Sequence, residues 1–231
     1  MNKNKHPLIS VIIPTYNESE TIKGTIEHLR TWNNQLEIII VDGGSKDGST
    51  NLINPEVKLL QAPRGRSSQM NAGALLASGE VLLFLHSDTR LPHDFLQQLE
   101  SSLSDSSVIG GAFKIKIDHP GLFFYLTSLS SNLRATITGI HFGDQAIFVR
   151  RDIFLKIGGF PPIELLEDWE FSLSMRRIGK TVLLPGPVRT SARRWLIHGK
   201  WRTTWLMHKI KVLYLLGTSP ADLKGMYSDR R

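Results

Sequence analysis

Short apolar runs alternate with segments of helical periodicity through the first half of the chain. Four runs have the length of buried strands, and they cover residues 8–13, 36–41, 57–61 and 81–85. Helical spacing of apolar residues occupies 22–32 and 67–77, and a short helix is expected after the turn at 43–50. This alternation predicts an α/β fold whose central sheet is mostly parallel and flanked by helices.

The second half of the chain is less regular. Helices are expected at 95–103, 122–134, 151–157 and 167–178, and strands at 109–117 and 146–149. No repeat, low-complexity stretch or long linker interrupts the sequence, so we expect a single domain over residues 1–231.

Carboxylates stand where buried strands are expected to end. Asp42 follows the run at 36–41, Asp88 follows the run at 81–85, and Glu18 lies in the loop after the first strand. Each acid taken alone could simply cap the next helix. Parallel strands bring their carboxyl ends to one edge of a sheet, where ligands bind in open α/β folds. Three acids gathered there would repel one another unless a positive group lies between them, and a nucleotide with a divalent cation supplies one.

Composition excludes several classes of site. The chain has 231 residues and no cysteine, so disulfides, thiolate metal sites and cysteine nucleophiles are absent. No apolar run approaches the roughly 20 residues that cross a bilayer, and the apolar run after the basic segment 1–7 ends at Pro14, too short for a signal peptide. We therefore expect a cytoplasmic protein. Its net charge of +7 suits nucleic acid, an anionic lipid surface or simple solubility.

Four motifs follow one another along the chain. They are Pro14-Thr15-Tyr16-Asn17-Glu18, Val41-Asp42-Gly43-Gly44-Ser45-Lys46-Asp47-Gly48-Ser49-Thr50, Asn71-Ala72-Gly73 and Ser87-Asp88. Their order and spacing resemble those of the family 2 glycosyltransferases, which have the Rossmann-like GT-A fold. The resemblance runs from about residue 10 to 195. The stretch 64–73 and Arg193-Arg194-Trp195 resemble a small bacterial subgroup, the radical-SAM/selenodomain-associated transferases, whose label names no substrate.

The resemblance implies a division of the chain and a binding site for a nucleotide-sugar donor. Residues of about 8–105 would form the nucleotide-binding half, about 106–195 the acceptor half, and about 196–231 a basic amphipathic tail. Asp42 would accept a hydrogen bond from the base, which suits the N3–H of uracil. Arg64 would reach toward the nucleotide, and Asn71 would hold the loop around it. The donor-binding residues implied in this way are Pro14, Tyr16, Glu18, Asp42, Gly44, Arg64, Asn71, Ser87 and Asp88.

The resemblance also implies that Asp88 binds Mg²⁺ or Mn²⁺ bridging the diphosphate, and oxygen ligands suit those ions. The family's Asp-x-Asp metal motif, however, is His86-Ser87-Asp88 here, so its first acid is missing. His86 remains open as a second metal ligand, a sugar contact, or a polar residue at a strand end.

A second acidic motif implies the catalytic base. Glu167-Asp168 follows the turn Gly158-Gly159-Phe160 and begins an expected helix, where acids are also stabilised by the helix dipole. Family members place a base in such a pair, so the resemblance assigns the base to Asp168, with Glu167 as second choice. A carboxylate near its ordinary pKa is a weak base, so burial or a neighbouring acid should raise the pKa.

Three further residues are implied on the acceptor side. Gly143-Asp144-Gln145 resembles the family's acceptor motif, which makes Asp144 either an acceptor contact or a turn-capping acid. Arg194 and Trp195 resemble the end of a Gln-x-x-Arg-Trp signature, but Ser191 stands in place of the glutamine. That signature marks processive synthases, so its absence favours transfer of a single sugar.

The tail has a distinctive composition. Residues 189–211 hold seven Lys or Arg, no acid and interleaved tryptophans, and a helix is expected there. The tail could pack on the core, bind nucleic acid, or lie on the inner face of the cell membrane as a peripheral anchor.

The resemblance therefore implies an inverting glycosyltransferase that moves one sugar from a nucleoside diphosphate sugar, with UDP favoured, to an acceptor hydroxyl. The acceptor is unknown, and a lipid or carotenoid type is one candidate. The alternative is a non-catalytic module that binds membrane or nucleic acid on a transferase-like scaffold. A dinucleotide oxidoreductase is disfavoured because no Gly-x-Gly-x-x-Gly follows the first strand.

Overall fold

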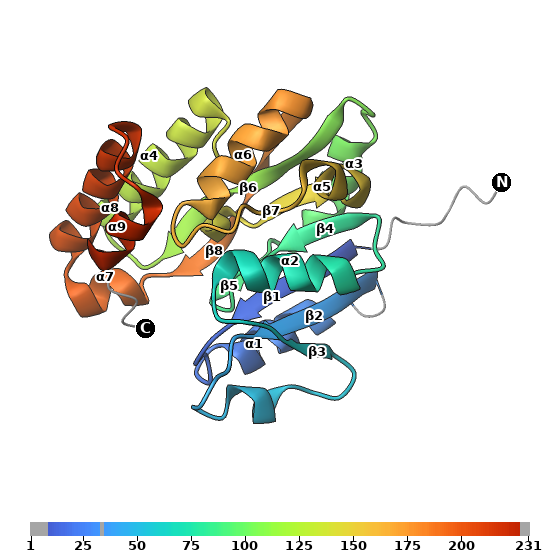
Figure 1. Cartoon of the computed structure of the whole chain (residues 1–231). Helices are drawn as coiled ribbons and strands as arrows, with labels where there is room; N and C mark the ends of the chain where they lie inside the picture. Colours follow the sequence, from blue (N-terminus) through green and yellow to red (C-terminus); the bar gives the residue numbers. More distant parts are fainter. Residues whose placement is uncertain (1–8, 33–34, 227–231) are drawn as a thin grey trace.

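The computed structural model describes residues 9–32 and 35–226, and it shows one curled sheet with helices on both faces (Figure 1). In the described part, the sheet has eight strands in the order β3-β2-β1-β4-β7-β6-β8-β5. The strands are β1 (Ile9–Thr15), β2 (Leu36–Asp42), β3 (Lys58–Gln61), β4 (Val81–Phe84), β5 (Thr89–Arg90), β6 (Val108–Asp118), β7 (Ile147–Arg150) and β8 (Lys180–Ser191). The α/β prediction is confirmed. Residue 8 of the first predicted strand lies outside the described residues.

The first four strands along the chain are parallel, as their apolar runs predict. β3, β2, β1 and β4 pair in parallel because helical crossovers connect them. These crossovers contain α1 (Ile22–Arg30), the 3₁₀ turn η2 (Ser49–Leu52) and α2 (Arg66–Leu76). In the register of β1 and β2, Thr15 lies opposite Asp42, so both strands end at one edge of the sheet. That edge carries the candidate site.

Beyond β4 the sheet becomes mixed. β7 is antiparallel to both β4 and β6, β8 is parallel to β6, and β5 is antiparallel to β8. Two apolar cores fill the faces, one around Phe95 and Phe113 and the other around Phe160 and Phe171. The sheet is therefore parallel in the half that the motifs occupy and mixed in the other half.

β8 is a strand that the apolar pattern does not predict. It contains Pro185 and Pro187, which lack the N–H that a sheet ladder uses. The register between β6 and β8 shifts between Phe113 and Ile115, which accommodates this irregular stretch. Because β8 runs to Ser191, the helix expected over 189–211 does not include its first three residues.

The remaining helices complete the fold. They are α3 (Phe95–Leu103), α4 (Leu122–Thr138), the 3₁₀ turn η3 (Gly143–Gln145), α5 (Arg151–Ile157), α6 (Glu167–Ile178), α7 (Arg193–His198), α8 (Lys200–Leu215) and α9 (Pro220–Met226). The C-terminal helices pack beside α4 and α6 through two small apolar clusters, centred on Trp195 and Trp169 (Figure 1). Residues 227–231 of the predicted tail lie outside the described residues. Among the helices described, none has both the length and the apolar character that crossing a membrane requires.

Candidate active site

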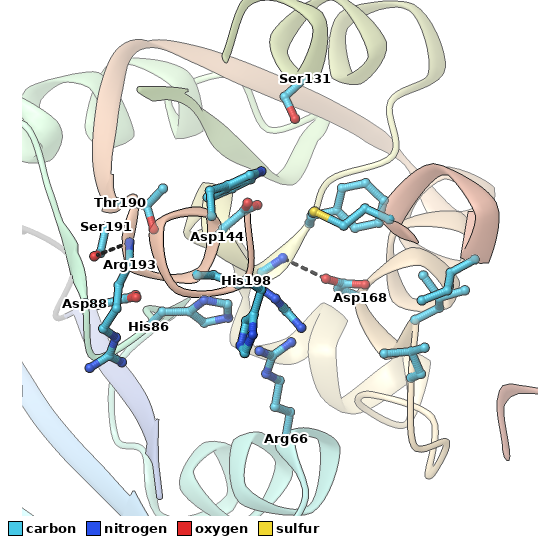
Figure 2. Close-up of a pocket in the computed structure, with 18 of the residues that line it drawn as sticks. Arg66, His86, Asp88, Ser131, Asp144, Asp168, Thr190, Ser191, Arg193 and His198 are labelled. Atoms are coloured by element: carbon cyan, nitrogen blue, oxygen red, sulfur yellow. Dashed lines mark hydrogen bonds between the residues drawn. The ribbon is translucent and has the colours of Figure 1, made fainter. Parts of the chain in front are cut away.

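A cavity of about 190 Å³ lies where the end of β4 meets α6 and the C-terminal helices. Acidic and basic side chains from distant parts of the chain line this cavity. Figure 2 shows seven of them: Arg66, His86, Asp88, Asp144, Asp168, Arg193 and His198. Six of the predicted donor, catalytic and acceptor-side residues line it: Asp88, Asp144, Glu167, Asp168, Arg194 and Trp195. The structure therefore brings the expected metal, base and acceptor-side residues into one cavity.

Asp168 is held by backbone donors at the start of α6. Its Oδ2 accepts a hydrogen bond from the N–H of Gly143 at 2.8 Å, and its Oδ1 accepts one from Trp169 at 2.8 Å. Burial raises the pKa of Asp168, although the Gly143 hydrogen bond and the positive charges of Arg66 and Arg134 act against that rise. A raised pKa makes the carboxylate a stronger base than an exposed aspartate.

Asp144 forms the second acid of the cavity. Burial, reinforced by the charge of Asp168, raises the pKa of Asp144 to about 6. Arg134, Lys211 and Arg66 lower it in turn. Two carboxylates in one cavity interact, so the negative charge of either acid raises the pKa of the other.

His86 lies in a tight space beside the base. A Cβ placed on Gly143 would stand 2.7 Å from His86 Nε2 and 3.6 Å from Asp168 Oδ2. Only a glycine therefore lets the imidazole approach this backbone. His86, Glu167 and Asp168 also line a smaller cavity of about 10 Å³ that Pro14 borders.

Three loops around the site contain strained backbone. Among the described residues, the non-glycine residues with positive φ are Asn17, Ala146 and Leu166. Each lies next to a motif: Asn17 precedes Glu18, Ala146 ends the turn that carries Asp144, and Leu166 precedes Glu167. Such conformations cost of order 1–3 kcal/mol each and persist where surrounding structure fixes them, commonly at functional sites.

The residues expected to bind the donor base lie outside the cavity wall. The guanidinium of Arg64 stacks over the ring of Tyr16 at 4.0 Å from its centroid. Asp42 accepts hydrogen bonds from the N–H groups of Gly44 and Ser45 at 2.9 and 3.0 Å and from the Ser45 hydroxyl. Its carboxylate thus holds the glycine-rich turn in place.

Glu18 joins the donor loop to the C-terminal half. It is buried, and its Oε2 accepts a hydrogen bond from Nη2 of Arg193 at 2.9 Å. Partial burial lowers the pKa of Arg193, but Glu18 and Asp88 outweigh this effect and raise it. Arg193 therefore lies between two of the three acids that the sequence placed at the strand ends.

Asn71 and Ser87, both expected to contact the donor, make hydrogen bonds within the protein in the structure. The side-chain amide of Asn71 donates to the carbonyl of Phe160 at 2.8 Å and accepts from its N–H at 2.9 Å. Asn71 thereby fixes the turn that leads to Glu167. Ser87 is buried, and its carbonyl accepts a hydrogen bond from Thr25 at 2.5 Å.

Comparison with known proteins identifies the family. The family model described as glycosyl transferase family 2 matches residues 10–158. This chain belongs to glycosyl transferase family 2. A glycosyltransferase named AglE from Haloferax volcanii is 28% identical over 171 residues, which cover 67% of this chain and 56% of that protein. An undecaprenyl-phosphate 4-deoxy-4-formamido-L-arabinose transferase from Aeromonas hydrophila is 26% identical, over 65% of this chain and 50% of its own length. The matched part thus spans about half the length of these two relatives.

Solved structures support the same fold. A mannosyltransferase from Pyrobaculum calidifontis, solved with GDP-Man and Mn²⁺, superposes with a TM-score of 0.67 at 20% identity and covers 96% of this chain and 68% of its own. Staphylococcus aureus TarS (residues 1–349), solved with UDP-GlcNAc, has a TM-score of 0.62 at 18% identity, with 79% and 58% covered. The family 2 chain therefore has the GT-A fold that its motifs imply.

The side chains in the cavity of this family 2 chain fit a divalent cation that is held by only one or two protein ligands. The described residues hold no group of three or more His, Asp or Glu side chains that could enclose an ion. Mg²⁺ commonly binds one or two carboxylates together with phosphate oxygens and water. Asp88 and His86 both line the cavity, and they are suitable protein ligands for a site of that kind.

Several cavity residues of the family 2 chain were not predicted from its sequence. Arg66 from α2, His198 from α7 and Lys211 from α8 line the cavity. Arg134 from α4 is not part of the lining, but its charge acts on both Asp144 and Asp168. The sequence contains one indication that Arg66 is functional. A cation at the first position of a helix is unfavourable because it opposes the helix dipole, so its presence there suggests another role. No such indication exists for Arg134 and Lys211, since each stands within a segment of ordinary helical spacing.

Proposed function

We propose that the chain transfers a single sugar from a nucleoside diphosphate sugar to an acceptor hydroxyl, with inversion at the anomeric carbon. The observation that carries this proposal is the cavity that joins Asp88 to Asp168 and Asp144. Membership of glycosyl transferase family 2 supports it, as do the donors present in the structures of similar fold.

Asp168 acts as the general base. It takes the proton from the acceptor hydroxyl as that oxygen attacks the anomeric carbon on the face opposite the diphosphate. Its raised pKa suits this task, and the N–H groups of Gly143 and Trp169 fix the direction of its oxygens. One base and a single displacement give inversion. Glu167, buried beside it, is the second choice.

The donor lies along the edge formed by the motif loops. The base and ribose lie against four residues of these loops: Pro14, Tyr16, Glu18 and Arg64. Gly44 and Ser87 lie at the ends of the loops that contact the donor. Asp42 accepts a hydrogen bond from N3–H of uracil, which favours UDP. A carboxylate accepts about four hydrogen bonds, and three donors in the turn leave capacity for that one.

Asp88 would hold Mg²⁺ or Mn²⁺, with His86 beside it. When bound, that ion would neutralise the charge that develops on the diphosphate leaving group. Arg193 is hydrogen-bonded to Glu18 and close enough to Asp88 for that charge to raise its pKa, so it contributes a positive charge on the same side of the cavity.

The acceptor side suits an amphipathic molecule, and we include a lipid or carotenoid type in the proposal. Asp144 and Arg194 supply polar contacts, while Trp195, Ile197 and Ile210 supply apolar wall. One relative is named as an undecaprenyl-phosphate transferase. The basic tail would hold the enzyme at the inner face of the cell membrane.

A thermal-shift screen tests donor and metal together. UDP-, GDP- and dTDP-sugars are added with and without Mn²⁺, and a UDP-sugar with Mn²⁺ should raise the unfolding temperature. Purified protein should also hydrolyse that donor slowly, and Asp88→Ala should abolish this hydrolysis. Asp168→Asn should retain donor binding but lose transfer. Absence of both binding and turnover across the panel would refute the proposal.

A further inference from the structure

The outward face of α4 is apolar. Leu122, Tyr125, Leu126, Leu129, Leu133 and Ile137 are each at least 50% exposed. At 100° per residue these positions fall within about 120° of the helix circumference, and Thr136 alone among polar residues shares that arc. We call these six residues the α4 stripe. A stripe of this width normally faces a protein core.

The inward face of α4 is instead the more polar one. Asn132 donates to the carbonyl of Ile115 at 3.0 Å and accepts from its N–H at 2.8 Å. Ser128 accepts a hydrogen bond from the N–H of Ile117 at 3.0 Å. These bonds attach α4 to β6 and leave its apolar side toward the surroundings. An exposed apolar face of this size is typical of an interaction surface.

The α4 stripe adjoins the exposed aromatic part of the C-terminal helices. Phe123 contacts Trp201 edge to face with ring centroids 5.1 Å apart, so α4 and α8 lie side by side (Figure 1). Trp201 and Trp205 are 79% and 64% exposed, and Leu196 and Ile197 of α7 are exposed beside them. Tryptophans with aliphatic residues and cations are typical of segments at a membrane interface.

The charge of this surface indicates which partner binds to it. No Asp or Glu occurs between Glu170 and Asp222, or between Asp118 and Asp144, and the two intervals contain α4, α7 and α8 with their Lys and Arg residues. A symmetric dimer through this face would place the same cations opposite each other and would be repelled. An anionic lipid surface attracts them and also accepts the apolar residues.

We propose that the α4 stripe, with exposed residues of α7 and α8, docks the protein on an anionic bilayer, next to the cavity that these helices also line. The same helices supply both surfaces: Ser131 of α4, Ile197 of α7 and Met207 of α8 line the cavity. This inference rests on the proposed function in one respect, since it makes the acceptor a lipid that presents its hydroxyl without leaving the membrane.

Vesicle sedimentation with the full chain tests the docking. Vesicles of phosphatidylcholine with about a third phosphatidylglycerol should bind the protein, and pure phosphatidylcholine should bind it far less. The double variant Leu126→Glu/Leu133→Glu should lower the partition coefficient on anionic vesicles about tenfold or more. The matched control Leu75→Glu/Leu155→Glu adds the same charge on exposed positions of α2 and α5 and should change it less than about threefold.

A second measurement does not depend on that variant folding. The chain has no cysteine, so Leu129→Cys can carry a polarity-sensitive dye, with Leu75→Cys as control. Vesicles should shift the emission of the first probe to shorter wavelength and leave the second unchanged. Equal responses of the two probes, or equal partition of the two double variants, would overturn the inference. So would a dimer in solution that Leu126→Glu/Leu133→Glu dissociates.

Donor binding separates this inference from the proposed function. Nucleotide-sugar thermal shifts should be the same in the parent and in all these variants, because none of them touches the cavity. Failure of vesicle binding with donor binding intact would reject the docking alone. Failure of donor binding with vesicle binding intact would reject the transferase proposal alone.

Discussion

Arg193, at the first position of α7, donates a hydrogen bond at 2.9 Å to Glu18, in the loop that follows β1. The Glu18 side chain is 2% exposed and that of Arg193 29% exposed. The ion pair therefore connects the donor loop with the C-terminal helices beside the cavity that Arg193 lines. It also accounts for a buried acid that would otherwise be costly.

Arg193→Ala should destabilise the protein because it leaves the buried Glu18 without this partner. We expect a loss of about 1–3 kcal/mol in the free energy of unfolding, together with a raised KM for the donor. Urea unfolding and initial rates measure the two effects. Arg189→Ala is the matched control, because Arg189 and Asp118 form an exposed pair at 3.7 Å, and it should cost less than about 0.5 kcal/mol. Similar losses in the two variants would contradict the role given to Arg193.

Asn71→Ala distinguishes a donor contact from a backbone support. Because the Asn71 amide makes two hydrogen bonds to Phe160, the variant should lose about 2 kcal/mol of stability. It should also lower kcat, since the turn it supports leads to Glu167 and Asp168, and leave donor affinity unchanged.

Asn132→Ala is the control for this prediction. Asn132 makes an equivalent pair of bonds to Ile115, away from the acids. It should cost similar stability without lowering kcat. A loss of donor affinity in Asn71→Ala alone would show that Asn71 contacts the nucleotide after all.

Catalysis should depend on pH through the Asp144–Asp168 pair. The base acts when deprotonated and burial raises the pKa of Asp168, so kcat should rise with pH above the range of an exposed aspartate and then level off. Asp144→Asn removes the neighbouring negative charge, which lowers the pKa of Asp168 and moves the acid limb to lower pH. A pH–rate profile that does not move would indicate that the two acids do not interact.

The same substitution should change stability with a definite sign. Folding raises the pKa of Asp144 from 3.8 to about 6, so the native state binds more protons between these values. Stability therefore falls as pH rises through this window. Asp144→Asn should be more stable than the parent at pH 8, by on the order of 1 kcal/mol, and the gain should disappear near pH 4. Thermal unfolding at both pH values measures the difference.

Gly143→Ala should displace His86, because the added Cβ would stand 2.7 Å from Nε2. We expect kcat/KM to fall about tenfold or more, as a small misplacement beside the base is costly. The double variant Gly143→Ala/His86→Ala restores the space and should match His86→Ala alone. Gly225→Ala, where an added Cβ meets nothing within 4 Å, should have no effect. A double variant worse than His86→Ala would show that the backbone, and not the imidazole, is disturbed.

The order of apolar and polar residues along the chain is enough to predict the parallel half of the sheet and the position of its acids. Apolar runs of strand length specify β1, β2 and β4, because such runs are stable only when both faces are covered. The residues that follow such strands lie at the same edge, so Asp42 and Asp88 could be placed there from the order of the chain. β8 was not predicted because its prolines interrupt the strand pattern, and pairing with β6 and β5 stabilises it in the folded chain.

Which charges meet, and which way α4 faces, depends on packing between elements that are far apart in the chain. Arg66, Arg134 and Lys211 come from three helices, and no local spacing records that their charges act on Asp144. Helical periodicity shows that α4 has an apolar side, but it does not show what that side contacts. The bonds from Ser128 and Asn132 to β6 settle this by turning the apolar side outward. Periodicity is a property of one segment, whereas the direction of a face depends on the partner against which the segment packs.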